Sequence, residues 1–106
     1  MARIVIAGPA DADSAEIVRD LTAKAGEVVA DRYEAEFAAL YRRLELFPES
    51  GSPRPALGLV VRAGVVAPYV VIHEYNETDD EVTILRIVHG RRKITRRMVN
   101  RPTSFA

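Results

Sequence analysis

The side chains that could do chemistry in this sequence are few, and two histidines stand out among them. His73 and His89 are the only imidazoles in the chain, and cysteine is absent. Histidine is the usual general acid or base near neutral pH, whereas a zinc site needs three or four ligands. Phosphate-binding and dinucleotide-binding glycine motifs are also missing. We therefore expect neither a metal nor a cofactor.

The two histidines have different surroundings along the chain. His73 lies in the middle of an apolar, alternating segment, which favours a hydrogen-bonded structural residue. His89 lies at the end of such a segment, beside Gly90 and Arg91, where a general base would be exposed. For His89 a structural role and a chemical role both stay open.

A cluster of basic residues follows His89. Six of the nine basic residues in the second half of the chain lie in the last sixteen positions: Arg91, Arg92, Lys93, Arg96, Arg97 and Arg101. On a short helix they would form two neighbouring basic stripes, with Ile94 and Met98 facing the body and Pro102 ending the segment. Such a cluster binds phosphate groups, binds an acidic protein partner, or is only solvated. Aromatic residues are scarce within it, so base stacking has weak support.

Hydrophobic periodicity indicates the elements of the first half. The apolar run at 3–7 predicts a strand, because Gly8 and Pro9 stop it. Apolar residues at helical spacing predict a helix over 9–25 and a second over 27–47, separated by Gly26. The second helix has the clearest stripe, which we expect to be buried: Val29, Tyr33, Phe37, Leu40, Leu44 and Phe47.

The second half of the chain indicates a small sheet. A proline-rich loop at 48–55 ends the helical hairpin. Segments rich in Val, Ile, Leu and Tyr then predict three strands, over 57–62, 69–76 and 82–89, which form an antiparallel meander. Helices would cover one sheet face. The other face is also apolar, so a partner covers it, the C-terminal segment covers it, or curvature of the sheet buries both faces.

Length and charge limit the class of protein. The chain has 106 residues, 48% hydrophobic and 28% charged, which predicts a single globular domain over 1–106. The predicted order of its elements, strand, helix, helix and three strands, makes that domain α+β. Its net charge is zero, but residues 1–50 carry a net −4 and residues 51–106 a net +4. No signal-peptide core or membrane-length apolar run occurs, so we expect a cytoplasmic protein without membrane contact.

Three motifs resemble the ParE branch of the RelE/ParE superfamily of bacterial toxins. They are FPESG at Phe47–Gly51, PYVV at Pro68–Val71 and ILRIVHGRR at Ile84–Arg92. The resemblance covers most of the chain and implies the same element order. It also implies the toxin of a type II toxin–antitoxin system, of the kind that stabilises plasmids, neutralised by a cognate ParD-like antitoxin in a heterotetramer or larger assembly.

The superfamily contains two activities on one fold. ParE-type toxins inhibit DNA gyrase and contact DNA only indirectly through it, whereas RelE-type toxins cleave messenger RNA on the ribosome. The ribonuclease branch has an arginine after the aromatic residue that begins the middle strand, and here Val70 follows Tyr69. No tyrosine follows Tyr75 to act in acid–base chemistry. The resemblance therefore favours gyrase inhibition without catalytic residues.

The resemblance also implies three sets of candidate residues. The expected target-binding residues are Arg86, His89, Arg91, Arg92, Lys93, Arg96 and Arg97. The expected antitoxin-binding residues are Tyr33, Phe37, Tyr41, Val70 and Ile72. For the ribonuclease alternative, the catalytic residues would be Arg62, Arg86, His89 and Arg91.

Overall fold

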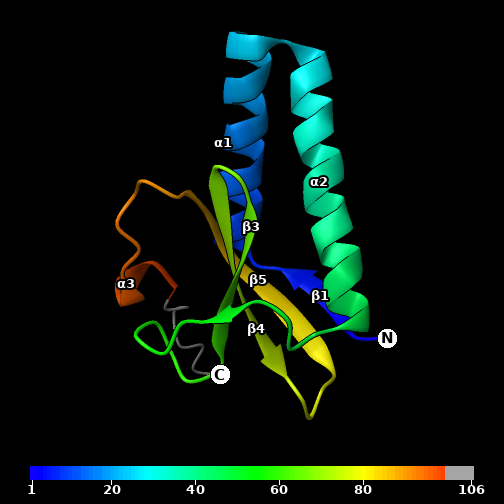
Figure 1. The fold of residues 1–106 in the computed structure, drawn as a ribbon, viewed down its shortest axis with the longest axis vertical. Coiled ribbons are helices and arrows are strands. Elements are labelled where there is room, and N and C mark those ends of the chain that lie inside the picture. The colour runs from blue at the N-terminus through cyan, green and yellow to red at the C-terminus, as the bar shows by residue number, and fades with distance from the viewer. Residues whose placement is uncertain (100–106) are drawn as a thin grey trace.

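A computed structural model of the chain describes residues 1–99 and contains a five-stranded sheet with a helical hairpin against it (Figure 1). The elements, in chain order, are β1 (Arg3–Ile6), α1 (Gly8–Ala25), α2 (Glu27–Leu46), β2 (Ser52–Pro53), β3 (Val61–Val66), β4 (Tyr69–Asn76), β5 (Glu81–His89) and α3 (Arg96–Val99). The predicted fold class is confirmed: an N-terminal strand, an antiparallel helical hairpin and a three-stranded antiparallel meander.

The sheet has the strand order β1-β5-β4-β3-β2. Strands β3, β4 and β5 form the expected meander. Two further pairings complete the sheet. Strand β1 runs parallel to β5, with Arg3 opposite Glu81, and the two-residue β2 pairs with β3. The first and last strands of the described residues are therefore neighbours.

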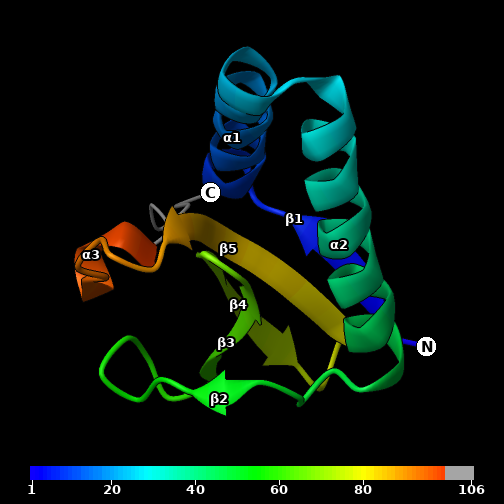
Figure 2. The same cartoon turned by 45° about the horizontal axis from the view of Figure 1, so that its top comes forward.

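The helical hairpin turns at Gly26. Its φ of +91° is a conformation that glycine adopts without strain, and its N–H donates to the carbonyl oxygen of Thr22 at 3.0 Å. Pro9 lies in the first turn of α1, where its missing N–H costs no hydrogen bond. Figures 1 and 2 show the helices side by side, with the turn between them far from the sheet.

The buried stripe of α2 is shorter than the sequence predicts. Phe37, Leu40 and Leu44 are buried against the sheet, and Tyr33 is partly buried. Phe47 is 63% exposed, so its expected place in the stripe is wrong. The reason is local, because α2 ends at Leu46 and the following backbone leaves the helical path.

The expected strand over 57–62 is also wrong. Residues 55–60 form turns, and the strand runs from Val61 to Val66. Gly64, a weak strand former, interrupts this apolar run in the sequence. A Cβ on Gly64 would lie 3.1 Å from Cδ1 of Leu40, so this glycine lets helix α2 approach the sheet closely.

The C-terminal segment, residues 91–99, covers the sheet face opposite the helices. Val99 is buried with Leu57, Ile72 and Leu85, and Ile94 packs against the same cluster. Of the alternatives for this face, the structure therefore has cover by the C-terminal segment. Helix α3 contains only Arg96–Val99, so no continuous helix aligns Arg92 with Arg96 into a stripe. The predicted contributions of Arg101 and Pro102 lie outside the described residues.

Candidate target-binding surface

Five cations of the cluster lie together after strand β5. Arg91, Arg92, Lys93, Arg96 and Arg97, which we call the basic segment, are all exposed. Within residues 1–99, none of them forms an ion pair. Their charges are therefore available to an anionic partner. Arg101 lies outside the described part of the chain.

Arg86 is not part of this exposed group. Its Nε donates to Oδ2 of Asp13 at 2.7 Å and its Nη2 donates to Oδ1 at 3.0 Å. The two side chains are only 18% and 15% exposed, and the carboxylate raises the pKa of Arg86. A bidentate, partly shielded pair of this kind holds the guanidinium in place. Arg86 thus contacts the protein rather than solvent.

His89 is exposed, as expected, but one of its ring nitrogens is hydrogen-bonded within the protein. Its Nδ1 accepts a hydrogen bond from the backbone N–H of Arg91 at 3.1 Å. In a neutral imidazole the accepting nitrogen carries no proton, so the proton is on Nε2. The ring also packs edge-to-face on Tyr69, with centroids 5.9 Å apart. His89 therefore lacks a free lone pair to act as a general base.

The four residues expected for a ribonuclease do not meet in one site. Arg62 on β3 is in register with His73, whereas His89 is in register with Tyr69. His73 and Tyr69 are four residues apart on β4, which corresponds to about 13 Å along a strand. Arg62 donates instead to the carbonyl oxygen of Gly51 at 3.2 Å.

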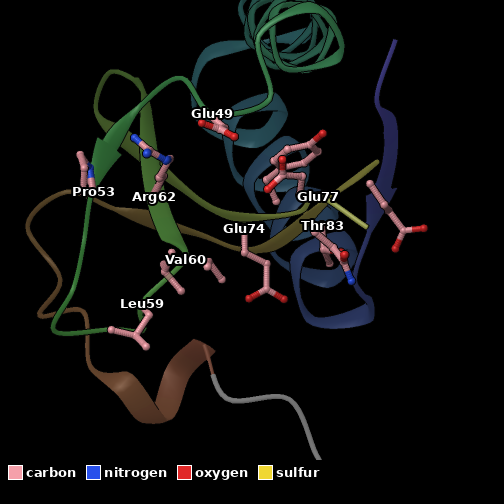
Figure 3. A pocket seen from close by; sticks show the side chains of 12 residues that line it. Glu49, Pro53, Leu59, Val60, Arg62, Glu74, Glu77 and Thr83 are labelled. Carbon is pink, nitrogen blue, oxygen red and sulfur yellow. The ribbon is translucent and has the colours of Figure 1, made fainter. Parts of the chain in front are cut away.

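Arg62 lines a cavity of about 510 Å³ whose other charged residues are acidic (Figure 3). Those residues are Glu49, Glu74, Glu77 and Glu81. Glu81 pairs with Arg3, but the carboxylates of the lining still outnumber the guanidinium groups, and this excess of negative charge repels the phosphates of RNA. The cavity is therefore unsuited to phosphodiester cleavage.

His73 is fully buried, which agrees with a structural role, but the expected hydrogen bond is missing. Neither ring nitrogen has a partner among the described residues. Burial, together with the nearby charge of Arg62, lowers the pKa of His73 to about 4. Gly51 packs against the ring, because a Cβ there would lie 3.1 Å from Nε2. The glycine of the FPESG motif thus makes room for a neutral imidazole.

The expected antitoxin-binding residues fall into two places. Phe37 and Tyr41 line a groove of about 530 Å³ between α1 and α2, together with Val18 and Ala38. Burial raises the pKa of Tyr41 to about 12.

The other three candidates lie away from this groove. Tyr33 packs edge-to-face on Tyr69, with centroids 5.8 Å apart. Val70 is half-buried and Ile72 fully buried at the opposite sheet face. Ile72 therefore offers no accessible surface while residues 91–99 are in place.

Sequence reasoning missed Asp13, which holds Arg86 from a position 73 residues earlier. No local pattern connects these two residues. Across residues 1–99 there is no cluster of three or more potential metal ligands, and no helix long and apolar enough to cross a membrane.

Comparison with known proteins supports a toxin. A family model described as the ParE toxin of the type II toxin–antitoxin system parDE matches residues 4–94. The chain is 32% identical over 91 residues to Toxin ParE3 of Caulobacter vibrioides, which covers 86% of this chain and 89% of that protein. In fold it is similar to a chain of the chromosomal ParDE system from P. aeruginosa, with a TM-score of 0.69 and 21% identity, covering 84% and 96% of the two chains.

The chain therefore belongs to the ParE toxin family. It is the toxin component of a type II toxin–antitoxin system, and its partner is a cognate antitoxin.

Proposed function

We propose that this toxin inhibits DNA gyrase, and thereby replication, through the basic segment. The observation that carries the proposal is the group of five exposed cations without an ion-pair partner within residues 1–99. Such a patch attracts acidic protein surface or DNA held by a protein, and it does so more weakly as salt rises. The ParE family assignment supports gyrase as the target.

The alternative of a ribosome-dependent ribonuclease has less support. Cleavage needs a general base for the 2′-hydroxyl and cations beside the reacting phosphate. The lone pair of His89 Nδ1 is used by a backbone N–H, and Arg86 is held by Asp13. Arg62 lies in another part of the sheet, so these residues do not form a catalytic group.

The test compares a charge reversal in the basic segment with a matched one elsewhere. We expect Arg96→Glu/Arg97→Glu to weaken inhibition of gyrase supercoiling about tenfold or more, because two attractive charges become repulsive. The control is Arg42→Glu/Arg43→Glu, an adjacent pair of exposed arginines on α2, which should change inhibition less than about twofold.

A parallel reaction with translating ribosomes and messenger RNA should leave the RNA intact. Wild-type protein that cleaves RNA, with cleavage lost in His89→Ala, would establish the ribonuclease instead. Equal loss of gyrase inhibition in both charge-reversal variants would remove the basic segment as the contact.

We also propose that the antitoxin occupies the groove between α1 and α2. The groove has an apolar floor, with Val18, Phe37 and Tyr41, and charged residues at its rim, with Arg19 and Glu34. A groove of this kind suits the apolar face of an amphipathic helix. We expect the complex to be a heterotetramer or larger.

A further inference from the structure

We propose that Asp13 is a positioning residue for the basic segment. Asp13 lies on helix α1, and through Arg86 it fixes the position of residues 91–97 relative to the sheet. The proposal rests on the proposed function only in its last step, the effect on gyrase. Its first step, the anchoring of residues 91–99, is a property of the fold alone.

Asp13 takes the place of a missing strand neighbour. Strand β1 ends at Ile6, opposite Ile84, so within residues 1–99 no strand pairs with the rest of β5 on that side. Beyond this point the N–H of Ile87 donates to Oδ2 of Asp13 at 2.9 Å. A buried N–H without an acceptor is costly, so the carboxylate stabilises this edge of β5.

The same carboxylate orients Arg86. It accepts from Nε at 2.7 Å and from Nη2 at 3.0 Å, which fixes two corners of a planar guanidinium. Because the group is rigid, the third nitrogen is fixed as well. That nitrogen, Nη1, points at the carbonyl oxygen of Met98 and donates to it over 3.4 Å. Asp13, Arg86 and Met98 therefore connect α1, β5 and α3.

Residues 91–99 thus have two attachments to the sheet. Ile94 and Val99 contact the apolar cluster around Ile72, and Met98 contacts Arg86. The apolar attachment is non-directional, whereas the hydrogen bond selects one placement. With both in place, the five cations stand on the solvent side. A segment already ordered loses less entropy when it binds its target.

Arg86→Lys separates this role from a direct one. A lysine keeps the positive charge and can pair with Asp13, but a single ammonium cannot also reach the Met98 carbonyl as a rigid fork does. A direct contact between Arg86 and the target would survive this change in large part. A positioning role would not.

The experiment measures anchoring and inhibition in the same set of variants. Amide hydrogen exchange by NMR should rise about tenfold or more at Met98, whose N–H donates to the carbonyl oxygen of Thr95 at 3.0 Å, in Asp13→Asn and Arg86→Lys, and stay unchanged at Val71 and Ile72. Gyrase inhibition should weaken about threefold or more in both. Asp31→Asn, the same change at an exposed site on α2, should resemble wild type in both measurements.

Each outcome decides the proposal. Unchanged exchange at Met98 in the two variants would overturn the anchoring, and raised exchange with full inhibition would overturn the positioning. If Asp13→Asn does not fold, Arg86→Lys makes the same test with the ion pair retained. If wild type fails to inhibit gyrase, the proposed function fails, while the exchange rates still decide the anchoring.

Discussion

The buried imidazole of His73 makes the stability of this toxin depend on pH. The ring is 0% exposed, its nitrogens have no partner within residues 1–99, and its pKa is lowered to about 4 from an ordinary 6.5. The unfolded chain therefore binds a proton between pH 6.5 and 4 that the folded chain does not bind. Stability must fall as pH decreases through this range.

The magnitude follows from the shift. Each pKa unit corresponds to about 1.4 kcal/mol, so His73 should cost about 3 kcal/mol of unfolding free energy between pH 6.5 and pH 4. Carboxylates add their own pH dependence, so the measurement is a difference between two proteins. Urea unfolding of wild type and His73→Leu, followed by circular dichroism at pH 7, 6, 5 and 4, provides it.

We expect the variant to be at least as stable as wild type at pH 7, because leucine removes two unpaired buried nitrogens. Its advantage should then grow by about 3 kcal/mol toward pH 4. Ile84→Val, a change at a buried residue that does not titrate, should keep the wild-type slope. A difference between wild type and His73→Leu that stays constant from pH 7 to pH 4 would refute the reasoning.

Two further predictions concern the helical hairpin. Leu44 is 0% exposed, so Leu44→Ala should lower the unfolding free energy in urea by about 2–5 kcal/mol, and Phe37→Ala by a similar amount, whereas Leu46→Ala, at a 62% exposed residue, should cost less than about 1 kcal/mol. Near-zero loss for Leu44→Ala would mean that the stripe is not core. Ala38→Glu should reduce affinity for the cognate antitoxin about tenfold or more in calorimetric titration, because it places a charge in the groove. Ala35→Glu is the matched control on α2, and equal affinities would exclude the groove.

The sequence predicted the elements whose signals are local. The helical hairpin follows from apolar spacing over twenty residues and from Gly26, and β4 matches its expected bounds of 69–76. The sequence places strand β3 at 57–62, four residues too early, because Gly64 weakens the strand pattern of residues 61–66. This glycine is explained by Leu40, which packs closely against it across the core. Leu57 lies in a turn and its side chain is buried in the apolar cluster, so its hydrophobicity reflects burial and not a strand.

The candidate target-binding surface was likewise predictable only where exposure depends on local sequence. Exposure of the five cations follows from their type and density, but the different environment of Arg86 depends on Asp13, far away in the chain. The covering of Ile72 by Val99 likewise depends on tertiary packing. Contacts between distant segments decide which of the predicted residues are accessible, and a single sequence contains no periodic signal for them.

The parallel pairing of β1 with β5 has a consequence for synthesis. Arg3 finds its partner Glu81 only when 78 further residues have been made, whereas the helical hairpin needs contacts within the first half alone. Chains emerge from the ribosome with the N-terminus first, and contacts between distant segments form slowly because loop closure must precede them. The sheet, with the basic segment that follows β5, therefore assembles last. The sheet therefore cannot be complete until strand β5, which ends at His89, has left the ribosome.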